Sequence, residues 1–279
     1  MRTIDTSLIA QTVYELALLA GKNLTQQAAS ALSAAAAKER NQNARFALST
    51  YVQNAQIARE TGLPVCQDTG MCVVFLEIGQ DVTLAGEFLG DAVNGAVARA
   101  YQNGYFRKSV CDPLTRKNTG DNTPAALHVE IVKGNKVKIT VLPKGFGSEN
   151  MSKLYMLTPS KGTEGIVQAV VDTVKAAGAN PCPPVYVGVG IGGTFDGAAL
   201  LAKKALLRPV GSFSDREDVK KIEQTCLEKI NALGIGAQGF GGDVTALGVS
   251  VETGATHIAG LPVAVNIQCH CVRAQSQTL

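Results

Sequence analysis

A cysteine followed at once by three polar side chains is the segment of this sequence best equipped for chemistry. Pro64–Gly70 places Cys66 directly before an amide, a carboxylate and a hydroxyl, which belong to Gln67, Asp68 and Thr69. A thiolate is a soft metal ligand, and a carboxylate beside it can serve as a general acid or base. The segment therefore combines a metal ligand with groups that move protons and donate hydrogen bonds.

Two further cysteines lie in similar surroundings much later in the chain. Cys182 is enclosed by prolines in Asn180–Pro184, and Cys269 follows the polar residues of Asn266–Gln268. If the fold brings both to Cys66, three thiolates can hold an iron–sulfur cluster and leave one iron open to a substrate. The elements between these cysteines must therefore gather three distant segments.

Composition limits the class of protein. The 279 residues are 46% hydrophobic and 18% charged, which is typical of a globular chain with a substantial core. A formal net charge of +3 without a basic block argues against a nucleic-acid or membrane partner. Seven cysteines without a Cys-x-x-Cys pair favour a reducing compartment over a disulfide framework or zinc ribbon. Since there is no signal-peptide core and no apolar run near the ~20 residues of a membrane span, we predict a cytoplasmic location.

The hydrophobic pattern predicts an α+β fold, in which a helical N-terminal region is followed by a mixed β-sheet with packed helices. Asp5–Ser7 offers candidate caps, and helices are expected over 8–19, 25–39, 43–60, 86–103, 163–177, 196–207 and 215–233. Strands are expected over 71–78, 185–189, 244–252 and 261–267. Two more β-like runs between 126 and 141 flank Lys133–Lys136, which predicts a hairpin turn. Residues 1–279 are interpreted as a single domain.

Two motifs of the form G-x-G-x-x-G raise the question of a nucleotide site. Gly188–Gly193 follows an expected strand and precedes an expected helix, which is the right context for a dinucleotide. Such a site also needs an acidic residue at the end of the next strand, where this sequence has the polar run Ser212–Asp215 leading into a helix. Gly234–Gly239 follows a helix, so tight turns and close backbone approach are the favoured interpretation of both motifs.

Three other features have a structural interpretation beside a functional one. The N–H groups of the loop Lys144–Asn150 could bind a carboxylate, or the loop could only connect two elements. Arg107 could hold a carboxylate or be a surface cation. His257, one of three histidines, could be an acid–base group or a structural residue. The residue pattern alone favours the structural interpretation of each.

Taken in order, these motifs resemble the iron–sulfur hydro-lyases of the class I fumarase and L-tartrate dehydratase family. The resemblance spans most of the chain and fits best the α subunit, or N-terminal domain, of a class I fumarase. It is carried by Pro64–Gly70, Arg107–Ser109, Asn118–Pro124, Pro143–Asn150, Asn180–Pro184, Gly190–Gly193, Gly234–Gly239 and Leu261–His270.

The resemblance implies a [4Fe–4S] cluster held by Cys66, Cys182 and Cys269. It also implies reversible hydration of fumarate to L-malate, with the open iron acting as a Lewis acid on a small dicarboxylate. Cys271 is an extra thiol where the family more often has a small residue, and it could compete with Cys269. Phe146 departs from the family's usual Gly-Gly-Gly run, which alters the substrate contacts expected of its loop.

The resemblance also implies the remaining site residues and a partner. Substrate-binding roles fall on Gln67, Asp68, Arg107 and the backbone around Gly145. Asp68 and His257 are implied as catalytic residues for proton handling or substrate orientation. Single-chain members of the family have a second domain that completes the site, so a separate β subunit is the expected partner, in a heterodimer or heterotetramer.

Three alternatives differ from this interpretation. Within the family, the chain could be an L(+)-tartrate dehydratase α subunit. In another class, it could be a non-catalytic iron–sulfur or zinc protein, in which four cysteines would saturate the metal. A nucleotide-binding module would depend on the glycine motifs and would bind nucleotide in a direct titration.

Overall fold

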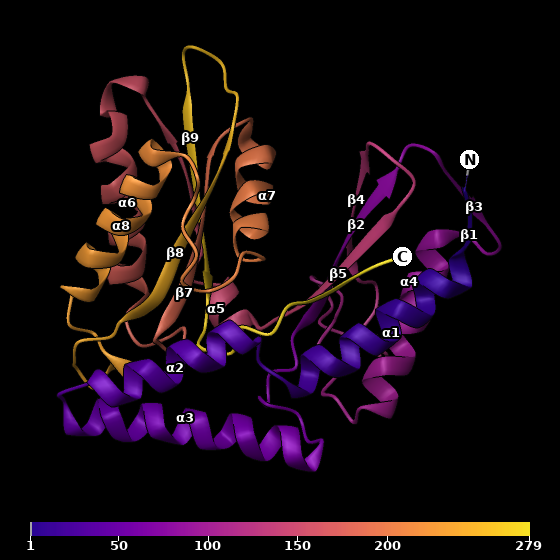
Figure 1. Ribbon diagram of the computed structural model, residues 1–279, viewed down its shortest axis with the longest axis horizontal. Coiled ribbons are helices and arrows are strands. Elements are labelled where there is room, and N and C mark those ends of the chain that lie inside the picture. Colours follow the sequence, from indigo (N-terminus) through magenta and orange to yellow (C-terminus); the bar gives the residue numbers. More distant parts are fainter. Residues whose placement is uncertain (1) are drawn as a thin grey trace. The chain divides into compact units, whose positions relative to one another are not determined.

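The computed structural model describes residues 2–279, which form two compact units. The first unit comprises the described residues up to Thr25, with Asn54–Phe146 and Arg273–Leu279, and the second comprises Gln26–Gln53 and Gly147–Val272. Each unit combines helices with a mixed sheet, which confirms the predicted α+β class (Figure 1). The interpretation of 1–279 as a single domain stays a prediction. None of the described helices has the length and apolar character needed to span a bilayer.

The first unit is built on a four-stranded sheet in the order β10-β5-β2-β4. Its strands are β2 (Met71–Gly79), β4 (Ala126–Val132), β5 (Val137–Lys144) and β10 (Gln275–Thr278). Apolar side chains of α1 (Thr6–Lys22) and α4 (Leu89–Asn103) pack on one face of this sheet. A parallel pair is formed by β1 (Arg2–Asp5) and β3 (Val82–Ala85). Of the candidate caps in Asp5–Ser7, Asp5 caps α1, because its carboxylate accepts a hydrogen bond from the Ser7 N–H at 2.8 Å.

The predicted hairpin at Lys133–Lys136 is wrong, although both of its strands exist. In the described sheet, β2 lies between β4 and β5, parallel to the first and antiparallel to the second. The connection passes across the end of β2, where the Gly79 N–H donates to the Lys136 carbonyl at 2.8 Å. A Cβ at Gly79 would lie 2.3 Å from the Gly134 carbonyl oxygen, so this crossing requires glycine. β2 is buried along most of its length, which suits a central strand.

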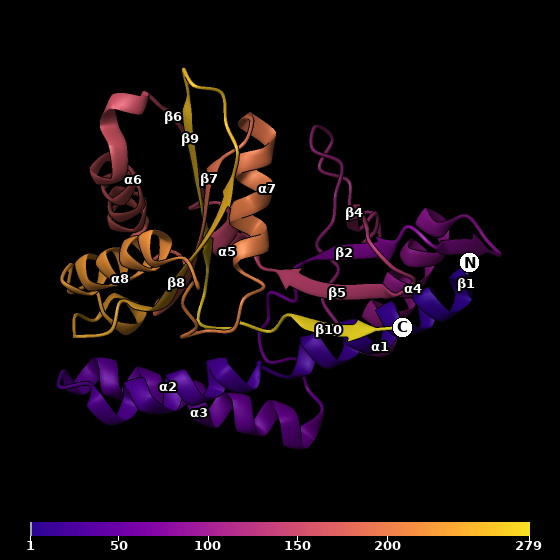
Figure 2. The ribbon, with the colours of Figure 1, turned by 45° about the horizontal axis from the view of Figure 1, so that its top comes forward.

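The second unit is built on a sheet in the order β6-β9-β7-β8. Its strands are β6 (Lys153–Leu157), β7 (Val185–Gly192), β8 (Ala246–Gly254) and β9 (Leu261–Gln268). One face is covered by α6 (Gly162–Ala177) and α8 (Glu217–Asn231), and the other by α7 (Phe195–Ala205), as Figure 2 shows. The other helices are α2 (Gln26–Lys38), α3 (Gln42–Thr61, which continues into the first unit) and the short α5 (Phe146–Glu149).

The glycines of the first G-x-G-x-x-G motif serve the packing of α7 on β7. A Cβ at Gly188 would lie 2.2 Å from the Ala202 carbonyl oxygen, and one at Gly190 would lie 2.1 Å from that of Ala198. The backbone of the helix therefore rests directly on the strand. Close approach, the interpretation favoured from the sequence, accounts for these glycines without a nucleotide.

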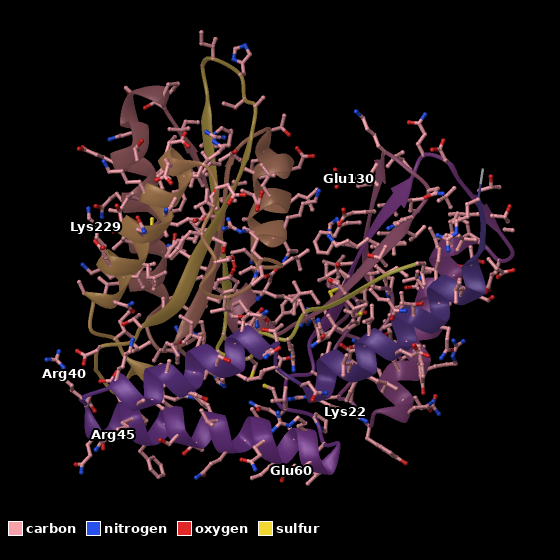
Figure 3. The ribbon with its side chains drawn as sticks, viewed as in Figure 1. Lys22, Arg40, Arg45, Glu60, Glu130 and Lys229 are labelled. Atoms are coloured by element: carbon pink, nitrogen blue, oxygen red, sulfur yellow. The ribbon has the colours of Figure 1, made fainter. Side chains whose placement is uncertain are left out.

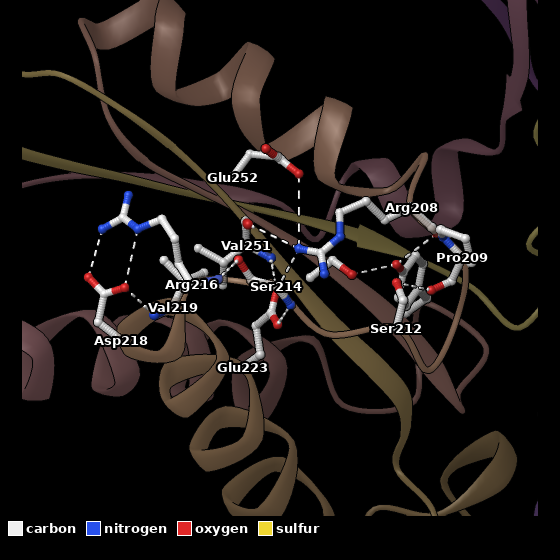
Figure 4. A network of polar contacts seen from close by, with 12 residues as sticks. Arg208, Pro209, Ser212, Ser214, Arg216, Asp218, Val219, Glu223, Val251 and Glu252 are labelled. Atoms are coloured by element: carbon white, nitrogen blue, oxygen red, sulfur yellow. Dashed lines mark hydrogen bonds and ion pairs between the residues drawn. The ribbon is translucent and has the colours of Figure 1, made fainter.

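A buried carboxylate fastens α8 to the sheet of the second unit. Glu223 is fully buried, and its Oε1 accepts hydrogen bonds from Arg208 Nη1 at 2.6 Å and from the Val251 N–H at 2.8 Å (Figure 4). Its Oε2 accepts from the Ser214 N–H at 2.8 Å. Lys229 of the same helix is exposed on its outer side (Figure 3). Both carboxylate oxygens thus have donors, and the guanidinium compensates the buried charge.

Replacing Glu223 by Gln is expected to destabilise the protein by about 3 kcal/mol, since it leaves Arg208 without its carboxylate partner and sets an amide N–H against existing donors. Urea unfolding of the full chain measures the effect as a lowered midpoint. Lys229→Gln, on the exposed side of the same helix, is the matched control. A Glu223→Gln variant as stable as wild type would contradict a stabilising role for this network.

Candidate active site

The Cys66 segment, Pro64–Gly70, connects α3 to β2 and belongs to the first unit. Its backbone is held by Asn54, whose Nδ2 donates to the Val65 carbonyl at 2.8 Å. Cys66 is partly exposed, and its sulfur lies 3.5 Å from Oε1 of the exposed Gln67. A fixed backbone therefore presents the thiol and the amide side by side.

Asp68 has a carboxylate whose orientation is set by backbone amides. Its Oδ1 accepts a hydrogen bond from the Gly70 N–H at 3.0 Å, and its Oδ2 accepts one from the Phe146 N–H at 2.9 Å. A Cβ at Gly145 would lie 3.0 Å from Oδ2, so the absence of a side chain there lets the loop approach the Asp68 carboxylate. Arg273 Nη2 donates to the main-chain carbonyl of Asp68 at 2.6 Å. The carboxylate and the main-chain carbonyl of Asp68 are thus both fixed by hydrogen bonds.

Arg107 lies beside the same segment. Its main-chain carbonyl accepts a hydrogen bond from Thr69 Oγ1 at 2.6 Å, while its side chain is exposed. The Tyr101 hydroxyl lies 2.9 Å from the carbonyl oxygens of both Thr69 and Gly70. Burial raises the pKa of Tyr101 well above its ordinary value, so the hydroxyl stays protonated as a donor. The first unit therefore brings five predicted residues to one region: Cys66, Gln67, Asp68, Arg107 and Gly145.

Two supporting residues were not predicted from the sequence. Arg273 is 2% exposed, its Nε lies 3.4 Å from the Pro143 carbonyl, and its Nη1 has no hydrogen-bond partner among residues 2–279. Asn122, fully buried, donates from Nδ2 to the Gly70 carbonyl at 3.1 Å. The only signal for Arg273 was its position shortly after Cys269. Both residues donate to main-chain carbonyls of the Cys66 segment, Arg273 to that of Asp68 and Asn122 to that of Gly70.

In the second unit, Cys182 occupies a strained position in the Cys182 loop, Asn180–Pro184. Its φ of 53° lies in the left-handed region, which costs a non-glycine residue about 1–2 kcal/mol. The Cys182 N–H donates to the Ala179 carbonyl at 3.1 Å, and the Gln238 N–H donates to the Pro183 carbonyl at 2.9 Å. These contacts fix the loop, and the cysteine side chain is exposed.

Cys269 follows the last residue of β9. Gln268 Nε2 lies 3.4 Å from the Cys269 sulfur and 3.0 Å from the Cys271 carbonyl oxygen. Gln268 Oε1 is buried and has no hydrogen-bond partner in the described chain. Cys271 is only 2% exposed, whereas Cys269 is partly exposed. Of the two thiols, that of Cys269 is therefore the accessible one.

Tyr51 of α3 lies near the cysteines of the second unit. Burial raises the pKa of Tyr51, the nearby Cys182 raises it further, and a hydrogen bond with the Gln238 side chain lowers it in part. Its ring stacks on that of His270, with 3.6 Å between the ring centroids. The imidazole of His270, which directly follows Cys269, lies 3.0 Å from the Cys182 carbonyl oxygen and brings the two cysteine-bearing segments together.

His257 lies elsewhere in the second unit, in the exposed connection between β8 and β9. The Ala259 N–H donates to its Nδ1 at 3.2 Å. Cys269 follows the opposite end of β9, and eight residues of strand extend about 25 Å. The structure therefore does not bring His257 to the two cysteines of its own unit, and its catalytic role stays a prediction.

The predicted cluster ligands are divided between the units, with Cys66 in the first and Cys182 and Cys269 in the second. Within the described chain, no three His, Cys, Asp or Glu side chains form a metal-binding group. The ligand set Cys66, Cys182 and Cys269 therefore stays a prediction.

Thiol reactivity is expected to follow these surroundings. Burial raises the pKa of Cys72 and that of Cys226, each to about 12. Because the thiolate is the reactive form, N-ethylmaleimide at mildly alkaline pH should label the exposed Cys182 and spare these two thiols in the native chain. Mass spectrometry of peptides after timed labelling measures this, with urea-unfolded protein as the control. Labelling of Cys72 ahead of Cys182 would contradict the assigned burial.

Comparison with known proteins identifies the family. The family model described as Fumarate hydratase (Fumerase) matches residues 10–278. A Methanocaldococcus jannaschii protein provisionally named L(+)-tartrate dehydratase subunit alpha is 43% identical over 269 residues, which cover 94% of either chain. The L(+)-tartrate dehydratase subunit alpha of Escherichia coli strain K12 is 35% identical over 223 residues, covering 79% of this chain and 74% of the relative. The chain therefore belongs to the fumarate hydratase family of hydro-lyases.

Proposed function

We propose that this chain is the α subunit of an iron–sulfur hydro-lyase that interconverts fumarate and L-malate. The observation that carries the proposal is the carboxylate of Asp68, fixed by two backbone amides two residues after Cys66 in a chain of this family. The names of the relatives as alpha subunits support a separate β subunit as partner, in a heterodimer or heterotetramer. A cytoplasmic location belongs to the same proposal.

The cysteines fit a [4Fe–4S] cluster, which Cys66, Cys182 and Cys269 would hold. Thiolates are the ligands that such clusters take. The contact from Gln268 Nε2 to the Cys269 sulfur, at 3.4 Å, is the kind of N–H···S interaction that tunes a ligating thiolate. When bound, the cluster would supply a Lewis-acidic iron for the hydroxyl and a carboxylate of the substrate.

The protein's own groups would bind the dicarboxylate and handle its proton. The exposed Arg107 guanidinium and the Gln67 amide would hold carboxylate oxygens, together with the backbone at Gly145. Asp68 would take the C3 proton of malate as the C2 hydroxyl leaves, and would return it in the hydration direction. A carboxylate held from two sides meets that proton from a fixed direction, which favours reaction. His257 is proposed as a second group for proton handling or substrate orientation.

Dehydration of L(+)-tartrate is the second candidate function, because the relatives carry that name. Tartrate differs from malate by one hydroxyl at C3. A site built to hydrogen-bond this hydroxyl discriminates strongly against a substrate that lacks it. The two candidates therefore separate in a direct comparison of substrates.

The test is an anaerobic reconstitution of the chain with iron and sulfide, followed by addition of a candidate β subunit and malate. We expect an iron–sulfur absorbance band, and fumarate formed only when both chains are present. Turnover of L(+)-tartrate without turnover of malate would establish the second candidate instead. A chain that takes up no cluster would contradict both.

A further inference from the structure

One imidazole joins the two cysteine-bearing segments of the second unit. His270 directly follows Cys269, and its Nδ1 lies 3.0 Å from the main-chain carbonyl oxygen of Cys182. A carbonyl oxygen only accepts hydrogen bonds, so Nδ1 carries the proton and donates. The contact thus links the end of β9 to the Cys182 loop, across 88 positions of sequence.

The same imidazole is held in place from its face. The rings of Tyr51 and His270 are stacked at 3.6 Å with an interplanar angle of 14°. The Tyr51 hydroxyl donates to the Pro183 carbonyl at 3.4 Å, so this half-buried residue contacts both the imidazole and the Cys182 loop. Helix α3 therefore supports the ring and the loop together.

The Cys182 loop depends on such external contacts. The φ of 53° at Cys182 is rare for a residue with a side chain, and such a backbone persists only where its surroundings fix it. His270 bonds the carbonyl of Cys182 itself and thereby sets the orientation of the peptide that follows the cysteine. The Gln238 N–H fixes the next carbonyl, that of Pro183, at 2.9 Å.

We propose that His270 is a positioning residue for the iron–sulfur centre. Its hydrogen bond fixes the position of Cys182 relative to Cys269, so that these two cysteines are arranged before the cofactor binds. Ligands that are already arranged lose less conformational freedom on binding, and outer-shell partners of ligands govern how firmly the metal is retained. The inference rests on the proposed function, because it needs a cluster to be retained.

The test compares two amide replacements of similar polarity in the full chain. In His270→Asn the amide nitrogen takes the place of Nδ1 and can restore the bond to the Cys182 carbonyl, whereas in His270→Gln it lies near the position of Nε2. We expect the Gln variant to lose iron to a chelator about tenfold faster than wild type, and the Asn variant to remain close to wild type. His128→Gln, in strand β4 of the first unit, is the control and should also remain close to wild type.

A second readout needs no cofactor. In the cluster-free chain, hydrogen exchange at the amides of Cys182 and Gln238 should be faster in His270→Gln than in His270→Asn, with equal urea midpoints. Equal iron loss and equal exchange in the two variants would overturn the positioning role while leaving the hydro-lyase proposal intact. A wild-type chain that binds no cluster would overturn both.

Discussion

Replacing Cys182 by Ser is expected to abolish the iron–sulfur absorbance of the reconstituted chain. We expect its hydro-lyase activity to fall by at least about a hundredfold, because loss of an outer-shell partner alone lowers activity by up to about that factor. A serine hydroxyl stays protonated near neutral pH and does not replace a thiolate. The Cys182 loop is fixed by its hydrogen bonds and contains no second cysteine that could take the place of Cys182. Absorbance and activity are measured after anaerobic reconstitution with the β subunit.

The matched control is Cys226→Ser, which changes a fully buried thiol of α8 within the same unit. Burial keeps that thiol neutral by raising its pKa to about 12, so its loss should affect stability rather than the cluster. Cys66→Ser should behave like Cys182→Ser. We expect the same of Cys269→Ser, since Cys271 is buried. A normal cluster spectrum in Cys182→Ser would contradict its role as ligand.

Replacing Asp68 by Asn is expected to lower kcat by about 10²–10⁴ while the cluster absorbance is retained. The amide has nearly the shape of the carboxylate but cannot take up the C3 proton. It also places an NH₂ group against one of two existing donors, the N–H groups of Gly70 and Phe146. Fumarate formation from malate gives kcat, and the absorbance of the same sample separates catalysis from cofactor loss.

Asp81→Asn, at an exposed carboxylate in the connection from β2 to β3 of the same unit, is the control and should leave kcat unchanged. Asp68→Asn with the kcat of wild type would remove Asp68 from proton transfer. The remaining candidate for that role would then be His257.

The elements with a long periodic or apolar pattern could be predicted from the sequence, and those defined by distant pairing could not. Helix α8 and strand β7 lie within a few residues of their expected positions. Strand β10, Gln275–Thr278, has no apolar residue and is a strand only because it pairs with β5. The hairpin error has the same origin, since no local pattern shows that β2 inserts between β4 and β5.

The residues of the candidate site also divide into those that the sequence could predict and those that it could not. Residue type alone singled out Cys66, Asp68, Cys182 and Cys269 as reactive groups. The supports were missed because each joins segments that are far apart in sequence, as when Arg273 bonds the Asp68 carbonyl or His270 bonds that of Cys182. The catalytic role of His257 came from the family resemblance, and strand β9 separates this residue from Cys269 within the second unit.

The most direct test of the central claim, three thiolate ligands and one open iron, is a Mössbauer spectrum of the ⁵⁷Fe-reconstituted complex with and without malate. We predict that the iron signal of a [4Fe–4S] cluster divides on addition of malate, with one iron in four changing its environment and three remaining cysteine-bound. A spectrum in which malate changes no iron would show a fully ligated cluster and would contradict the account.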